Sequence, residues 1–293
     1  MALDYHTPVP PAPPAGRPRT PWSHRLLASH SAAVYLFLYV PILVLVVFSF
    51  NRGRQVGIWQ GFSLHWYARL WADEPLREAT VNSLIAAGWA TAVSTVIGTL
   101  AALGLWRLSP RRRAGRGALA ATRGLLYLPV IIPEIVLGVA LLTSFSLLRV
   151  RLSMTTVVVA HVVFTVSYVA VVVRARLAGL DRSLEEAAMD LGAGPAATFV
   201  RVVLPLAAPG IGAGALLAFT ISLDDYVVTS LVCGVDSTTL PVHVYAAMKP
   251  GVTPEINAVC TVLLGLTVVM ILVAQWLLRE RGEDGRREAP NGE

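Results

Sequence analysis

Residues 31–50 read SAAVYLFLYVPILVLVVFSF, a run of twenty residues that contains no charged side chain. A helix needs about 20 apolar residues to cross the hydrocarbon core of a bilayer. Lipid offers no hydrogen-bond partners to an exposed backbone, so a segment of this kind crosses the membrane as a helix. This stretch therefore predicts a membrane protein built from helices.

Five further segments meet the same length and apolar character. With Ser31–Phe50, the expected spans are Val81–Trp106, Leu125–Leu148, Met154–Val173, Leu206–Leu223 and Asn257–Leu278. The fold class expected is all-α, a polytopic membrane protein with six transmembrane helices in residues 25–278. Residues 1–24 hold seven prolines and are expected to form a disordered tail. Residues 279–293 are expected to form a charged tail.

Composition agrees with a membrane protein. The chain is 55% apolar and 14% charged, whereas roughly a quarter of the residues in a soluble protein are charged. Its two cysteines exclude a disulfide scaffold and a four-cysteine metal site. A soluble enzyme is therefore not expected.

The basic residues are distributed unevenly between the two sides of the six spans. Seventeen of the 24 lie in the N-terminal segment, the loops 107–123 and 174–205, and the C-terminal tail. Because cytoplasmic segments are enriched in Lys and Arg, we expect both termini in the cytoplasm. The run Arg111–Arg113 is interpreted as part of this topological signal. It has no interleaved aromatic residues, and no nucleic-acid partner is expected.

The loop before the fifth span reads DRSLEEAAMDLGAGPAATFVRVVLP, residues 181–205. Ser183 and Glu186 have the spacing of a capping box, which predicts a helix beginning at Leu184. Gly192 is expected to end this helix, and a second helix is expected to open at Gly194–Pro195 and to stop at Pro205. The apolar residues favour a docking surface for a protein partner, or a pair of helices that lies on the bilayer.

This loop resembles the EAA loop of inner-membrane permease subunits of binding-protein-dependent ABC importers. The resemblance rests on Glu186–Ala187–Ala188, on Gly192 and on Val202–Pro205, where Val202 replaces the usual isoleucine. It implies a coupling helix that docks in a groove of a separate ATPase. The coupling residues implied are Glu186, Ala187, Ala188, Gly192, Leu204 and Pro205. The partners implied are two ATPase copies, a second homologous permease and an extracytoplasmic solute-binding protein.

The chain itself lacks the phosphate-binding loop of an ATPase. Its single lysine, Lys249, follows Met248, so the pattern GxxxxGK[ST] is absent. No nucleophile–base pair or metal-ligand cluster lies in or near the expected spans. We therefore expect a transport subunit that is not an enzyme, with no catalytic, cofactor or metal site, and with ATP used by the partner ATPase.

Four acidic residues lie in or beside the expected spans: Glu134, Asp224, Asp225 and Glu255. A charge at mid-bilayer costs roughly 2.5–3.5 kcal/mol on insertion scales, so such an acid usually faces a partner or a water-filled path. Each acid also has a simpler interpretation: neutralisation or helix pairing for Glu134, solvation at the membrane edge for the aspartates, and a first-turn acid for Glu255. Together they suit a path for a cationic substrate.

A second resemblance is to the permeases of spermidine and putrescine importers. It rests on Pro133–Gly138, Ser222–Thr229, Thr239–Val242 and Pro254–Ala258. It implies a permease in a bacterial inner membrane that carries a polyamine. Permeases for iron, thiamine or an amino-acid-like solute share parts of these motifs and remain an alternative. An ion-driven secondary transporter would also use buried acids, but it would need no EAA loop.

Overall fold

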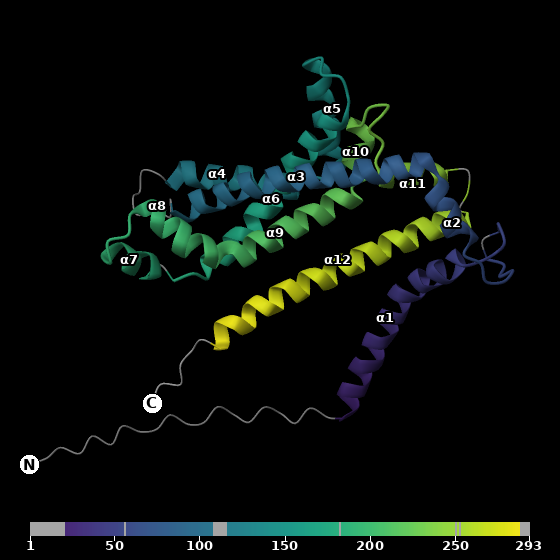
Figure 1. The fold of residues 1–293 in the computed structure, drawn as a ribbon, viewed down its shortest axis with the longest axis horizontal. Coiled ribbons are helices and arrows are strands. Elements are labelled where there is room, and N and C mark those ends of the chain that lie inside the picture. Colours follow the sequence, from purple (N-terminus) through teal and green to yellow (C-terminus); the bar gives the residue numbers. More distant parts are fainter. Residues whose placement is uncertain are drawn as a thin grey trace, which may run out of the picture. The chain divides into compact units, whose positions relative to one another are not determined.

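The computed structural model describes residues 21–55, 57–107, 116–181, 183–249, 251 and 253–287. Regular structure in these ranges is helical, apart from one isolated antiparallel bridge between Asn51 and Phe62 (Figure 1). The all-α expectation is confirmed. Of the expected disordered tail, residues 1–20 lie outside the described residues, and the first helix already begins at Pro21. The expected charged tail is helical as far as Arg287.

The chain divides into two units, of which the first comprises Met1–Val47. It holds nearly all of helix α1 (Pro21–Ser49), and the part from Arg25 to Ser49 is long and apolar enough to span a membrane. Side chains from Arg25 to Val44 are exposed. A helix that is apolar on every side is typical of a segment surrounded by lipid.

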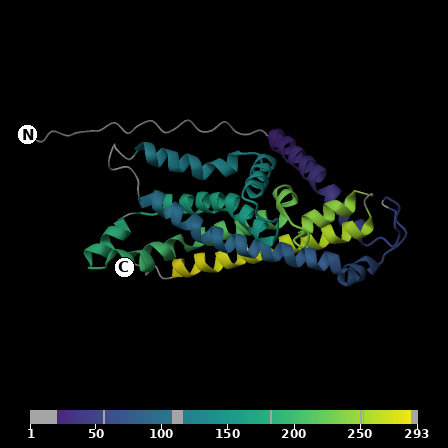
Figure 2. The same cartoon turned by 90° about the horizontal axis from the view of Figure 1, so that it is seen from above.

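The second unit, Phe48–Glu293, is built around three long helices that pack side by side (Figures 1 and 2). These are α3 (Glu74–Arg107), α6 (Met154–Ala178) and α9 (Leu204–Asp224). Small residues, including Ala86, Ala90 and Ala102, are buried along α3. Helices in a membrane associate mainly through such close packing and through hydrogen bonds. The hydroxyls of Ser94 and Thr165 make one such bond, 2.5 Å long, between α3 and α6.

The fifth expected span begins earlier than the sequence predicted. Helix α8 (Pro195–Thr198) continues through a π-helical turn, η2 (Phe199–Val203), into α9, so that Pro195–Asp224 forms one apolar stretch of 30 residues. The expectation that Pro205 ends a helix was wrong. The N–H of Leu204 donates to the Phe199 carbonyl, five residues back. This wider turn accommodates a proline ring that would clash with the carbonyl four residues earlier in a regular helix.

The third expected span, Leu125–Leu148, is not a single helix. It is divided between α4 (Arg116–Ile131) and α5 (Glu134–Leu147), whose axes differ by 105°. The break falls at Ile132–Pro133, because a residue before proline is disfavoured in the α conformation. The carbonyl of Pro133 then accepts the N–H groups of Val136 and Leu137 at 2.9 and 3.2 Å, which starts α5.

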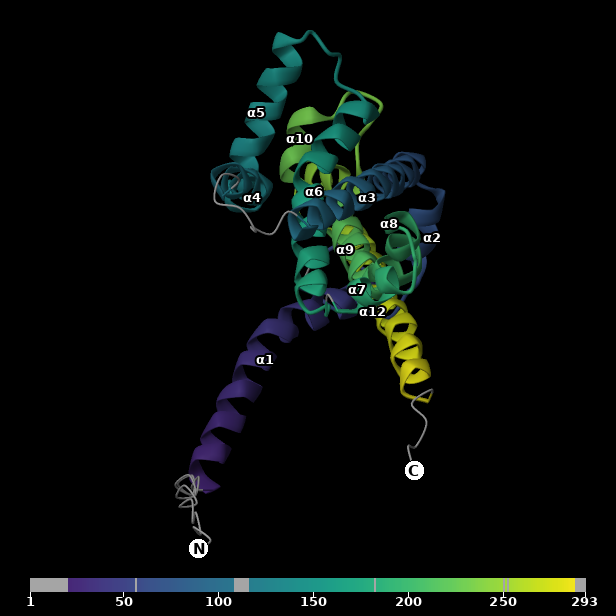
Figure 3. The same cartoon turned by 90° about the vertical axis from the view of Figure 1, so that its left-hand side faces the viewer.

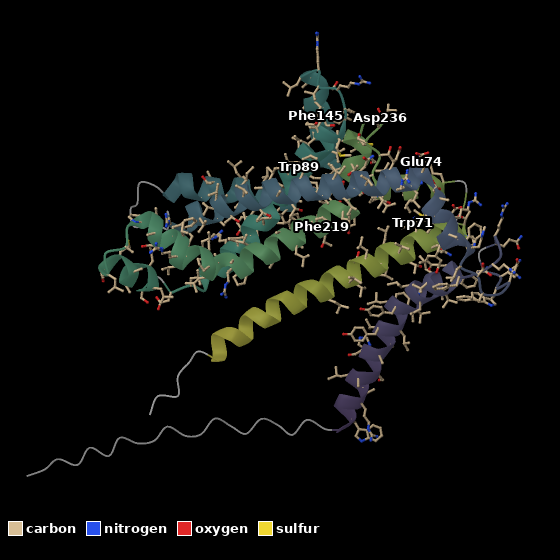
Figure 4. The ribbon with its side chains drawn as sticks, in the orientation of Figure 1. Trp71, Glu74, Trp89, Phe145, Phe219 and Asp236 are labelled. Carbon is tan, nitrogen blue, oxygen red and sulfur yellow. The ribbon has the colours of Figure 1, made fainter. Side chains whose placement is uncertain are left out.

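Four further helices of the second unit are α2 (His65–Ala72), α10 (Val227–Val232), α11 (Leu240–Met248) and α12 (Pro254–Arg287). The loop after α10 carries Asp236 (Figure 4) and is hydrogen-bonded to α3. There the amide of Asn82 donates to the Thr238 carbonyl at 3.1 Å.

The expected count of six spans is not fully confirmed. In the described ranges, four helices qualify as spans, and the bent pair makes five. The sixth expected segment, Asn257–Leu278, lies within α12, whose apolar part is Pro254–Val269.

Candidate functional site

The loop 181–205 begins with a short helix, α7 (Ser183–Asp190). It starts one residue earlier than the expected Leu184. The Asp181 carboxylate accepts the N–H of Ser183 at 2.9 Å, and the Asp181 carbonyl accepts that of Leu184 at 3.4 Å. The hydrogen bond from Ser183 lowers the pKa of the Asp181 carboxyl below its ordinary value.

Gly192 lies just beyond the last helical residue, Asp190, and terminates the helix as the sequence predicted. Gly192 has a φ of 89°, a conformation that costs little only for glycine. Its N–H donates to the Met189 carbonyl at 2.9 Å, and the N–H of Ala193 reaches back to the Ala188 carbonyl at 3.1 Å. These two bonds form a Schellman motif, which reverses the chain towards α8.

The apolar side chains of α7 point away from the rest of the second unit. Leu184 is 48% exposed and Leu191 is 90% exposed. Glu185 faces inward instead, and its side chain lies 3.3 Å from Nη2 of Arg107 at the end of α3. Leucines are therefore exposed on the outer side of this segment, and a carboxylate faces the rest of the second unit. A helix that only covered a core would place its apolar side chains inward instead.

The six expected coupling residues lie in two groups. Glu186 and Ala187 are exposed on α7, beside half-buried Ala188, with Gly192 at the end of that helix. Leu204 and Pro205 begin α9, beyond the π turn. The first group belongs to a hairpin formed by α7, the turn at Gly192, α8 and η2, which is called the α7 hairpin below. The second group lies where this hairpin joins α9.

Three of the four expected path acids come together. Glu134 is the first residue of α5, Asp224 is the last residue of α9, and Asp225 follows it. The carboxylate of Glu134 lies near enough to Asp225 and Asp224 to be repelled by both. Glu134 and Asp224 are exposed, whereas Asp225 is buried.

The proximity depends on the break at Pro133 and on α10. Helices α5 and α10 pack against each other (Figure 3). They approach closely at Gly138, where a Cβ atom would lie 2.7 Å from a methyl carbon of Leu231. A larger residue at position 138 would require the Leu231 side chain to move.

Asp225 belongs to a buried polar network that the sequence did not predict. Its Oδ2 accepts the Thr229 N–H at 2.8 Å and the Thr229 hydroxyl at 2.7 Å, so it caps α10. His161 of α6 lies 3.4 Å away and bonds the hydroxyls of Ser222 and Thr229 at 2.6 and 2.8 Å. His161 is fully buried, and both of its ring nitrogens are hydrogen-bonded within this network.

Asp224 instead lines a cavity of about 370 Å³ between α9, α11 and α12. The rings of Tyr226 and Tyr245 form part of its wall, with centroids 4.2 Å apart. The remaining wall is mostly apolar, with Leu223, Val244 and Leu263 among its residues. A carboxylate beside aromatic rings is an arrangement that attracts organic cations. The sequence motif contained Tyr226, but its pairing with Tyr245 depends on the tertiary fold.

Glu255, the fourth expected path acid, has a different partner. It lies in the first turn of α12, and its carboxylate is 3.5 Å from Nε of Arg69 on α2. This ion pair gives Glu255 a structural role at a helix N-terminus.

Residues 28–279 match the family model described as the binding-protein-dependent transport system inner membrane component. This chain belongs to that family. The permease is 39% identical over 247 residues to the spermidine/putrescine transport system permease protein PotC of Haemophilus influenzae, covering 84% of this chain and 94% of the relative. It is 40% identical over 274 residues to the putrescine transport system permease protein PotI of Escherichia coli K12, covering 92% and 94%.

The fold of the permease is also found in a solved structure. A chain of a bacterial ABC transporter involved in the import of the acidic polysaccharide alginate superposes with a TM-score of 0.71. The two chains are 16% identical, and the match covers 88% of the permease and 96% of the other chain. At this identity the likeness establishes the shared helical architecture.

Proposed function

We propose that this permease is a membrane subunit of an ATP-driven importer for a polyamine such as putrescine or spermidine. The observation that carries the proposal is the cavity beside Asp224, where an exposed carboxylate, the ring pair of Tyr226 and Tyr245 and apolar walls meet. Glu134, at the start of α5, adds a second exposed carboxylate close to Asp224.

A polyamine suits this arrangement better than a compact cation. It carries ammonium groups separated by methylene chains, and the cavity beside Asp224 offers one carboxylate, a tyrosine pair and apolar walls. The carboxylate and rings would hold an ammonium group, and the apolar walls would contact the methylenes. Two relatives named for putrescine or spermidine transport, each about 40% identical, support the same substrate class.

The exposed α7 hairpin supplies the coupling role. Leu184, Leu191 and Ala187 form a surface that would seat in a groove of an ABC ATPase, with Glu186 at its edge. Closure of two ATPase copies on ATP would then move α7, and α9 would carry the motion into the membrane. In this chain Gly192 shapes the hairpin, and Leu204–Pro205 joins it to the span.

The remaining partners follow from the architecture and the family. Four to five candidate spans in the described residues make part of a translocation path, so a second, homologous permease would complete it. An extracytoplasmic binding protein would deliver the solute, as the family's description indicates. The arginine distribution supports a topology in which both termini and the α7 hairpin lie on the cytoplasmic side of a bacterial inner membrane.

Uptake in cells tests the substrate class. A strain that lacks the permease should recover uptake of labelled putrescine or spermidine when the permease is supplied again. Its uptake of iron, thiamine and amino acids should be the same with and without the permease. Unchanged polyamine uptake in the deletion strain would contradict the proposal. Uptake that persists when ATP is depleted and the membrane potential is held would instead favour a secondary transporter.

A further inference from the structure

Arg107, the last residue of α3, contacts both arms of the α7 hairpin. Its Nη2 lies 3.3 Å from Oε1 of Glu185 in the first turn of α7. Its guanidinium carbon lies 5.4 Å from the centroid of the Phe199 ring, at the start of the π turn. Glu185 and Phe199 flank the turn at Gly192 in sequence, so one side chain joins the two halves of the hairpin.

The helix that carries Arg107 is firmly held in the core of the second unit. Near its cytoplasmic end, Ala102 and Leu103 belong to one buried cluster with residues of α6 and α9. The other members of this cluster are Val169, Val173, Leu177, Val203, Ala207 and Ala218. Phe199 and Trp106 pack against the same cluster. A force that displaces Arg107 would therefore move α3 together with the helices that it packs against.

The covalent route from α7 into the membrane is less regular. It passes through the turn at Gly192 and then through η2, whose π geometry interrupts the α-helical ladder. Single π turns within a helix are frequently found at functional sites. A contact that bypasses the turn would carry motion from α7 directly to the core.

We propose that Arg107 is a positioning residue that ties α7 to α3, so that movement of the docking hairpin reaches α3 as well as α9. This inference rests on the proposed coupling role of the hairpin. In this role Arg107 acts through Glu185 and Phe199. The ion pair is polar and partly exposed, with 46% of the Arg107 side chain and 22% of the Glu185 side chain accessible. It can therefore be reversed in sign without burying a new charge.

The first test is a charge reversal in the full transporter reconstituted in proteoliposomes. Arg107→Glu should leave the ATPase bound and active, but putrescine moved per ATP hydrolysed should fall about fivefold, as expected for losing an exposed ion pair and a cation–π contact. Arg107→Glu with Glu185→Arg should restore much of the ratio. The matched control is the Glu74–Arg77 pair, 3.6 Å apart at the other end of α3. Arg77→Glu should leave the ratio unchanged.

The second test needs no transported solute. Spin labels at Leu100 and Met189, both exposed and both outside the proposed docking surface, report the separation of α3 and the α7 hairpin in a variant whose Cys233 and Cys260 are replaced by alanine. The distance distribution should be narrow and the same with and without ATP, and Arg107→Glu should make it broaden and depend on ATP.

The outcomes separate the two proposals. An unchanged transport ratio in Arg107→Glu, loss of the ATPase from that variant, or a double reversal no better than either single change overturns the role of Arg107. If the unsubstituted transporter hydrolyses ATP but moves no polyamine, the proposed substrate fails. The label distances then decide the role of Arg107, and a distribution unaffected by Arg107→Glu overturns it.

Discussion

The carboxylate of Asp225 lies 3.4 Å from Nε2 of His161, and both side chains are buried between α6, α9 and α10. Asp225 also receives two hydrogen bonds from Thr229. This relationship gives adjacent aspartates different roles. Asp225 anchors α10, whereas Asp224 is exposed on the wall of a cavity.

Replacing His161 with leucine should destabilise the permease by about 1–3 kcal/mol, because Ser222, Thr229 and Asp225 would each lose a buried partner. Thermal unfolding of the purified protein in detergent measures the change. His243→Leu is the matched control, since His243 on α11 is only half-buried. Equal unfolding temperatures for His161→Leu and the unsubstituted protein would show that the network contributes nothing.

Two substitutions of Asp225 separate anchoring from a path role. Asn retains an oxygen that can accept the Thr229 N–H, whereas Leu removes every polar contact. Asp225→Asn should therefore keep the unfolding temperature and most of the uptake, and Asp225→Leu should lose both. If Asp225→Asn stays folded but abolishes uptake, the negative charge itself is required and Asp225 is part of the cation path.

Removing the charge from Glu134 or Asp224 should weaken cation transport more than assembly. Glu134→Gln and Asp224→Asn each preserve size and should raise the KM for putrescine about tenfold, the effect of losing a charged hydrogen bond of roughly 1.5 kcal/mol. Asp236→Asn is the control, because Asp236 is an exposed carboxylate in the loop after α10. Unaltered kinetics in either path variant would remove that residue from the proposed path.

The hairpin makes a separate prediction about docking. Leu191→Asp places a charge on the exposed apolar surface of α7 and should release the ATPase during purification, without lowering the unfolding temperature. Val235→Asp is a stringent control, since Val235 is 93% exposed in a different loop. Full retention of the ATPase by Leu191→Asp would mean that this surface is not the docking site.

Gly192 tests the shape of the same hairpin. Gly192→Ala forces a side chain into a left-handed conformation, at a cost of roughly 1–2 kcal/mol, and should reduce both ATPase binding and uptake. Gly194→Ala should have little effect, because Gly194 has a φ of −69° and open space around it. A Gly192→Ala variant with normal uptake would show that the reversal at this position is not required for coupling.

The positions of most membrane helices and the end of α7 could be predicted from the sequence, because single residues and short stretches of chain determine them. Long apolar runs predicted the membrane helices, and Gly192 predicted the end of α7. The acids of the candidate path could be named because charges in apolar segments are costly. Their association could not be predicted, since Glu134 is 90 residues from Asp224 along the chain.

The errors in the sequence-based prediction concern backbone geometry around prolines. Pro133 breaks a span and redirects it by 105°, whereas Pro205 is absorbed by a π turn within a continuous helix. Both prolines lie in apolar segments, so local composition did not distinguish them. The Arg107–Glu185 pair was missed for a related reason. Arg107 was interpreted only as a topological charge, and its contact depends on how α3 packs beside α7.

Uptake by the reconstituted transporter tests the central claim most directly. The permease, its companion permease, the ATPase and the binding protein would be placed in liposomes with ATP inside, and labelled putrescine would be added outside with its binding protein. The account predicts ATP-dependent accumulation that excess spermidine suppresses, that thiamine or iron leaves unchanged, and that Asp224→Asn weakens while Asp236→Asn does not. Accumulation that is absent, independent of ATP, or equally sensitive to both substitutions would contradict it.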